Sequence, residues 1–179
     1  MCIRDSLSPV LVWDILMTEE EFDECATTVN NLAPHTFDAI RVQCMGAARF
    51  LKEQHTSTPI QLIAETANCN LPTLQLWTRI LGGQLSRLIL SIQLPGEKIA
   101  EYVQSLPIPC EVLGAGRILL FYSRRNLLLK NFGDLDESWR EVLAETERSG
   151  NRPYPVIDNV HGTFMYLDKD QFILHKVHD

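Results

Sequence analysis

Four consecutive polar side chains, Tyr122, Ser123, Arg124 and Arg125, end an apolar run that begins at Ile118. Arginine can hold a carboxylate or phosphate through two parallel N–H groups, a geometry that lysine does not offer. The pattern predicts a strand whose end presents these four side chains to a substrate. The alternative is a pair of surface arginines that close a strand. Ser123 is not expected to be a nucleophile, because no Gly-x-Ser-x-Gly turn surrounds it and no histidine is spaced as its base.

A carboxylate and an amide follow another apolar run, which begins at Ile60. Glu65 and Asn70 lie just beyond it, so they are further substrate-binding candidates if the run is a strand of a parallel sheet. Each has a structural alternative: Asn70 could cap the following helix, and Glu65 could form an ion pair.

The cysteines have no spacing typical of metal ligands, and the histidines form no HExxH motif. The sequence contains no CxxC or CxxxC pair. We therefore predict no metal site and single, unpaired thiols. The catalytic residues stay unassigned.

Strand-like and helical segments alternate along the first two thirds of the chain. The strand-like runs begin near Leu11, Asp38, Ile60, Arg87 and Cys110. The helical patterns between them cover residues 19–32, 46–54, 72–81 and 97–106. Such alternation predicts βα units around a parallel sheet. A capping box of Thr18 and Glu21 should begin the first helix.

Two architectures fit this alternation, an open doubly wound sheet and part of an eight-stranded barrel. The spacing of apolar residues does not distinguish between these two architectures. No glycine-rich phosphate loop follows the first strand, which weakens the doubly wound interpretation.

Beyond Phe132 the pattern changes. Residues 134–147 read as a polar amphipathic helix, with Asp134 and Glu137 at capping spacing. A loop over residues 149–155 and a β-rich segment are expected to follow it.

Two segments resemble the collagenase-like peptidases, a family whose catalytic residues are unsettled. Residues 111–129 read EVLGAGRILLFYSRRNLLL, and residues 161–174 read HGTFMYLDKDQFIL. The first segment keeps the family's residues at several positions: Glu111, Gly116, Tyr122, Ser123, Arg125, Leu127 and Leu128. The second keeps a Lys-Asp pair, which adds Asp170 to the binding candidates, with a turn-stabilising role as its alternative.

The resemblance favours the barrel. It implies an α/β chain that forms part of a TIM-like (β/α) barrel with parallel strands. Residues 7–133 would be the middle of the barrel, and residues 134–179 a helix and β-rich segment that continue the same domain. Barrel segments would be missing before residue 7 and after residue 179. Residues 1–6 resemble the translation of a sequencing adapter, as expected for a metagenomic fragment; a genuine start is the alternative.

Cluster-binding members of the family have cysteines where this chain has Leu119 and Asn126. Neither side chain can replace a thiolate, so we expect no iron–sulfur cluster. The resemblance implies a cluster-free peptidase, a hydrolase that binds a peptide-like or small anionic ligand through Arg125, Glu65 and Asn70. The alternative is a non-catalytic subunit that partners a cluster-bearing paralogue in hydroxylation of RNA bases or quinone precursors.

Charge and hydropathy restrict partners and location. The net charge of −7 disfavours nucleic acid as a ligand, because phosphate binding needs a basic face. No apolar run approaches the ~18 residues of a membrane span, and no secretory signal is visible. We therefore expect a cytoplasmic protein.

Overall fold

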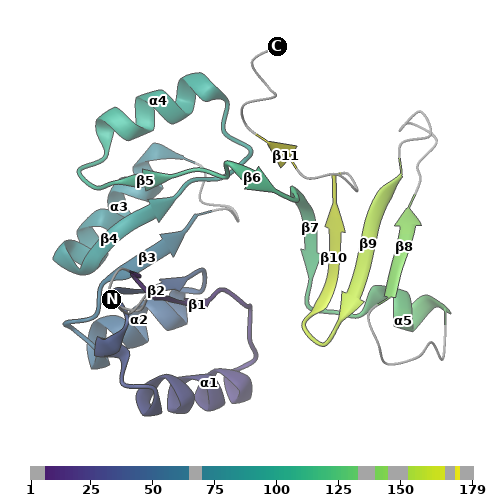
Figure 1. Ribbon diagram of the computed structural model, residues 1–179, viewed down its shortest axis with the longest axis horizontal. Coiled ribbons are helices and arrows are strands. Elements are labelled where there is room, and N and C mark those ends of the chain that lie inside the picture. Colours follow the sequence, from purple (N-terminus) through teal and green to yellow (C-terminus); the bar gives the residue numbers. More distant parts are fainter. Residues whose placement is uncertain (1–6, 65–69, 133–139, 145–152, 168–171, 174–179) are drawn as a thin grey trace. The chain divides into compact units, whose positions relative to one another are not determined.

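The computed structural model describes residues 7–64, 70–132, 140–144, 153–167 and 172–173. The chain divides into two compact units, Met1–Val112 and Leu113–Asp179. Within the part that the structure describes, no helix is both long enough and apolar enough to cross a membrane. Each unit has its own sheet (Figure 1).

The first unit alternates strand and helix, as the sequence predicts. Its strands are β1 (Val10–Trp13), β2 (Ala39–Val42), β3 (Ile60–Ile63), β4 (Leu85–Ile89) and β5 (Cys110–Glu111). Its helices are α1 (Glu19–Asn31), α2 (Met45–Gln54), α3 (Leu71–Leu81) and α4 (Gly96–Ser105), with short 3-10 turns η2 (Pro34–Thr36) and η3 (Gly82–Gln84). The predicted helix boundaries are each confirmed to within one residue.

Local sequence signals explain where two of these helices begin. The Thr18 hydroxyl accepts a hydrogen bond from the Glu21 amide, and the Glu21 carboxylate accepts one from the Thr18 amide at 2.8 Å. This capping box confirms the predicted start of α1. At α3 the Asn70 side chain caps the helix and Pro72 occupies its first turn, where a missing N–H costs no hydrogen bond.

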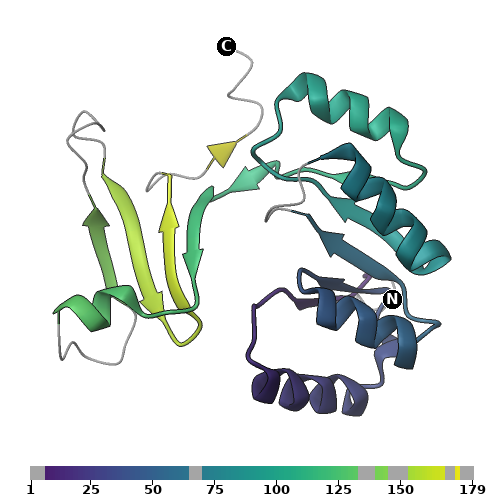
Figure 2. The same cartoon turned by 180° about the vertical axis from the view of Figure 1, so that it is seen from behind.

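The sheet of the first unit is parallel throughout and its strand order follows the chain, β1-β2-β3-β4-β5. The α/β class is therefore confirmed. The strands and helices can be followed by colour, from purple to teal, in both views (Figures 1 and 2). Among the described residues β1 and β5 are the two edges, so this sheet is open there and shows no closed barrel.

One face of this sheet packs against all four helices. Ile40, Leu62 and Leu88 each lie next to one polar residue of the same strand, and they are fully or almost fully buried. They share one hydrophobic core with residues of α1 to α4, among them Leu51 and Leu74. Because strand side chains alternate between faces, the polar residues next to these three point to the face that these helices do not cover. We call this second face the helix-free face.

The second unit is built on an antiparallel sheet. The order of its strands is β7-β10-β9-β8. The strands are β7 (Leu119–Ser123), β8 (Arg140–Ala144), β9 (Tyr154–Asn159) and β10 (Gly162–Tyr166). A short helix, α5 (Leu127–Phe132), follows β7, and β6 (Ala115–Gly116) pairs with β11 (Phe172–Ile173). The strand predicted from Ile118 onward is thus confirmed as β7.

The helix predicted over residues 134–147 is wrong where the structure describes it. Residues 140–144 form β8, which pairs antiparallel with β9 so that Val142 lies opposite the buried Val156. Helix propensity is a weak preference, and pairing with a strand distant in the sequence overrides it here. The proposed capping residues Asp134 and Glu137 lie outside the described residues.

Candidate functional site

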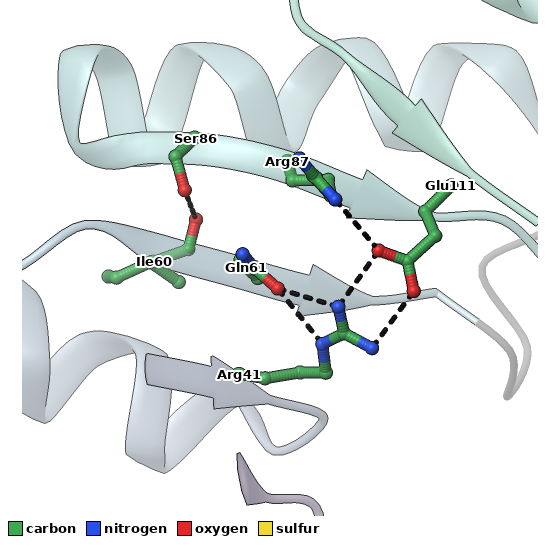
Figure 3. Close-up of polar contacts among 6 residues, drawn as sticks. All are labelled: Arg41, Ile60, Gln61, Ser86, Arg87 and Glu111. Atoms are coloured by element: carbon green, nitrogen blue, oxygen red, sulfur yellow. Dashed lines mark hydrogen bonds and ion pairs between the residues drawn. The ribbon is translucent and has the colours of Figure 1, made fainter. Parts of the chain in front are cut away.

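Polar side chains from four neighbouring strands meet on the helix-free face. Arg41 of β2 is in register with Gln61 of β3, which is in register with Arg87 of β4. Glu111 of β5 lies opposite Ile89, two residues beyond Arg87, and therefore on the same face. We call Arg41, Gln61, Arg87 and Glu111 the polar cluster (Figure 3). Glu111 ends β5 and Arg41 is the penultimate residue of β2, whereas Gln61 and Arg87 lie in the middle of β3 and β4.

Arg41 is the centre of the polar cluster. Its Nη1 and Nη2 atoms donate to the two carboxylate oxygens of Glu111 at 3.0 and 2.8 Å, which is a bidentate ion pair. Its Nε and Nη2 atoms donate to Gln61 Oε1 at 2.9 and 2.7 Å. These bonds fix the orientation of both neighbours (Figure 3).

Arg87 is held more loosely than Arg41. Its Nη1 atom donates to Glu111 Oε2 at 3.1 Å. The Arg87 side chain is 45% exposed, whereas that of Arg41 is 24% exposed. The strand register shifts between Ile60 and Gln61 beside it, and the Ser86 hydroxyl donates to the Ile60 carbonyl at 3.0 Å in this irregularity. The shift sets Arg87 directly opposite Gln61.

The electrostatics of the polar cluster favour a charged Glu111. Partial burial raises the pKa of the Glu111 carboxyl, but hydrogen bonds and charges from Arg41 and Arg87 outweigh it, so the pKa lies below its usual value. At neutral pH this carboxylate is ionised and engaged by two guanidinium groups. It is therefore poorly suited to accept a proton as a general base, and the cluster is better suited to binding an anion.

The lowered pKa of Glu111 makes its contribution to stability depend on pH. A carboxyl group whose pKa is lower in the folded state contributes its full stabilisation of the fold above its unfolded pKa of about 4.3. This contribution is lost as the pH falls through the folded pKa. We expect the Glu111→Gln variant to be about 1–3 kcal/mol less stable than the wild type at pH 7. Urea denaturation of both proteins from pH 7 to pH 3 should show that the difference between their free energies of unfolding decreases below about pH 4.3.

The matched control is Glu53→Gln, which removes the carboxylate of an exposed pair with Arg49 on α2. Exposed pairs of this kind contribute little, so its stability should follow the wild type at every pH. A Glu111→Gln gap that stays constant down to pH 3 would contradict the assigned ion pairs.

The candidates at the end of β7 make local contacts. The Tyr122 hydroxyl donates to the His161 carbonyl at 2.9 Å, and Ser123 Oγ accepts from the Arg125 amide at 3.2 Å. The Arg125 carbonyl accepts from the Thr163 hydroxyl at 2.8 Å. The Arg125 side chain is exposed and the Arg124 side chain is half-buried. The strand end therefore presents Arg125 to solvent, while Ser123 supports the turn after β7.

The other candidates lie elsewhere. Asn70 Oδ1 accepts a hydrogen bond from the Thr73 amide at 2.9 Å, so Asn70 caps α3, as its structural alternative predicts. Such a cap stabilises a helix by about 1 kcal/mol. Glu65 and Asp170 lie outside the described residues. Asn70 belongs to the first unit, whereas Tyr122, Ser123, Arg124 and Arg125 belong to the second.

Sequence reasoning missed most of the polar cluster. The sequence pattern identifies Glu111 as a motif residue but not as a site residue, and it assigns no role in a site to Arg41, Gln61 or Arg87. A signal was present: each interrupts an apolar strand run at an alternate position, so each faces away from the core. The pairing of these positions across strands needed the register.

Leu119 lies within β7, and Asn126 lies between β7 and α5. The absence of an iron–sulfur cluster, expected from these two residues, stays a prediction. Across the described ranges no three His, Cys, Asp or Glu side chains are grouped so that they could hold a metal ion.

One of three comparisons with known proteins supports the family resemblance, over residues that include the first of its two motifs. Neither the curated proteins nor the solved structures gave a significant match to this chain. A family model described as Peptidase family U32 matches residues 4–152, which include the first unit from residue 4 onward and part of the second. The chain therefore belongs to peptidase family U32.

Proposed function

We propose that this chain is part of a cluster-free hydrolase of peptidase family U32 that binds a peptide-like ligand at the carboxyl ends of its parallel strands. The observation that carries the proposal is the polar cluster. Four neighbouring strands place two guanidinium groups, an amide and a carboxylate on the face of the sheet that the helices leave uncovered. Family membership supports the reaction class.

The proposed setting of this site is the interior of a (β/α) barrel. A doubly wound sheet reverses its strand order and carries helices on both faces, whereas a barrel keeps the order of the chain and carries helices outside. The order β1 to β5 and the single core shared by α1 to α4 support the second arrangement. The helix-free face is then the barrel's interior, where barrel enzymes bind their substrates near the carboxyl ends of strands.

The remaining candidates are considered separately in each unit. In the second unit we propose that Arg125, with Arg124, Tyr122 and Ser123 beside it, binds an anionic group, and Asp170 stays a candidate there; in the first unit Glu65 and Asn70 stay candidates for polar contacts. The exposed Arg125 side chain supports this role. The catalytic group stays unassigned, and we propose a cytoplasmic location.

A second candidate function is a non-catalytic subunit that partners a cluster-bearing paralogue in hydroxylation of RNA bases or quinone precursors. The observation that favours it is that the side chains that could act as a base or a nucleophile already make hydrogen bonds within the protein. Glu111 is held by two arginines and Ser123 supports a turn, so neither is available as a catalytic base or nucleophile. The net charge of −7 speaks against direct binding of RNA by this chain.

Cleavage of denatured collagen and casein by the 179-residue chain separates these functions. The hydrolase should cleave at least one of them, and Arg125→Ala should lower kcat/KM about tenfold or more, because a charge-assisted bidentate contact is lost. Glu65→Ala should lower it as well. Arg49→Ala, which removes an exposed arginine of α2, should leave the rate unchanged.

A chain that cleaves neither protein, and that co-purifies with a cluster-bearing paralogue, would favour the accessory subunit. Cleavage at the wild-type rate by both Arg125→Ala and Glu65→Ala would remove these residues from the proposed site.

A further inference from the structure

We infer that Arg87 and Gln61 bind a carboxylate of the ligand, such as the free carboxyl terminus of a peptide, on the helix-free face. The peptide-like nature of the ligand rests on the proposed function; the carboxylate site itself rests on the geometry of the polar cluster. Three observations carry it: the uneven use of the arginine N–H groups, a buried amide without a partner, and the charge balance.

The two arginines of the polar cluster use their hydrogen-bond donors very differently. A guanidinium group has five N–H donors. Arg41 makes four hydrogen bonds, to Gln61 and Glu111. Arg87 makes one to the described residues, through Nη1 to Glu111. Arg87 is thus anchored and half exposed, with most of its planar donor fork open to a ligand.

The second donor comes from Gln61. Its side-chain oxygen accepts two hydrogen bonds from Arg41, which fixes the amide so that the NH2 group points away from Arg41. Gln61 is 8% exposed, and its NH2 group has no hydrogen-bond partner among the residues that the structure describes. A buried polar group without a partner is costly, and a ligand oxygen would remove that cost. Gln61 lies directly opposite Arg87 in the sheet.

The charge of the polar cluster matches a single negative charge. Two guanidinium groups and one carboxylate leave one excess positive charge. The neighbouring positions on this face, Ile63 and Ile89, are apolar and buried, so screening by water is reduced. A carboxylate supplies one charge and two coplanar oxygens that fit a guanidinium fork, whereas phosphate would bring more charge than the cluster neutralises.

The test compares acetyl-trialanine with a free carboxyl terminus, its carboxyl-terminal amide, and inorganic phosphate, each titrated into the 179-residue chain by NMR. The acid should bind about tenfold or more tightly than the amide, because the amide lacks the charge. Arg87→Gln should lower the affinity for the acid by about the same factor and leave that for the amide unchanged. Arg87→Lys keeps the charge but not the planar pair of N–H donors, so its affinity for the acid should lie between those of the wild type and Arg87→Gln.

Arg49→Gln, on the surface of α2, is the matched control and should bind the acid like the wild type. Equal binding of acid and amide by the wild type overturns the carboxylate site, as does an unchanged affinity in Arg87→Gln. Tighter binding of phosphate than of the acid overturns the carboxylate assignment. Acid-selective binding without cleavage of casein or denatured collagen would support the carboxylate site and contradict the hydrolase function. The test therefore distinguishes failure of this inference from failure of the proposed function.

Discussion

Replacement of Gly162 by alanine is expected to destabilise the second unit by about 4 kcal/mol, the sum of roughly 1–3 for backbone strain and roughly 1–3 for steric overlap. Gly162 opens β10 with φ of 122°, a conformation that residues with a side chain rarely adopt. A Cβ atom there would lie 2.1 Å from the Ser123 carbonyl oxygen and 2.8 Å from Arg124 Cα. Both contacts are with backbone, which cannot rotate away. Urea denaturation should show the loss.

Gly114→Ala is the control for this prediction, because it lies in the same unit and a Cβ there would meet nothing within 4 Å. Its stability should stay within about 0.5 kcal/mol of the wild type. A Gly162→Ala variant as stable as Gly114→Ala would contradict the close approach of β10 to the strand end that carries Arg124 and Arg125.

The second large effect is expected at Asp158, a buried carboxylate of β9. Its Oδ2 atom accepts from the amides of Leu128 and Leu129 at 3.0 and 3.1 Å, and Oδ1 contacts the Thr163 hydroxyl. Asp158→Ala removes the acceptor of the buried Leu128 amide and of the partly buried Leu129 amide, so we expect a loss of about 3 kcal/mol in the free energy of unfolding. Hydrogen exchange should show faster exchange of the Leu128 and Leu129 amides.

Asp158→Asn is the matched variant, since it keeps the shape and one acceptor oxygen. Its expected loss is about half as large, because one oxygen can still accept from both amides. If Asp158→Ala costs less than about 1 kcal/mol, this carboxylate does not anchor α5 to the sheet.

The fold of the first unit could be predicted because its signals are local. Alternating apolar runs mark the strands, and the caps at Thr18 and Asn70 mark where helices begin. The strand order and the single covered face are not local, and they emerged only from the pairing of β1 to β5. The second unit was predicted less well, because residues 140–144 have helix-forming residues but pair as β8.

The candidate site was predicted in part, for a comparable reason. The cluster at the end of β7 is contiguous in the sequence, so Tyr122 to Arg125 could be recognised by eye. The polar cluster is assembled from single residues in four different strands, and a lone Arg41 or Arg87 in a strand reads as an ordinary exposed position. Only the register brings their side chains to one carboxylate.

The strand order of the first unit also bears on how the chain folds. Each strand from β2 to β5 pairs with the strand synthesised immediately before it. Pairing with the preceding strand closes a shorter loop than pairing with a more distant strand, and it allows βα units to be added one by one as the chain leaves the ribosome. In the second unit β7 pairs with β10, so it must wait until β8 and β9 have been made. The order of synthesis and the order of assembly therefore coincide in the first unit and differ in the second.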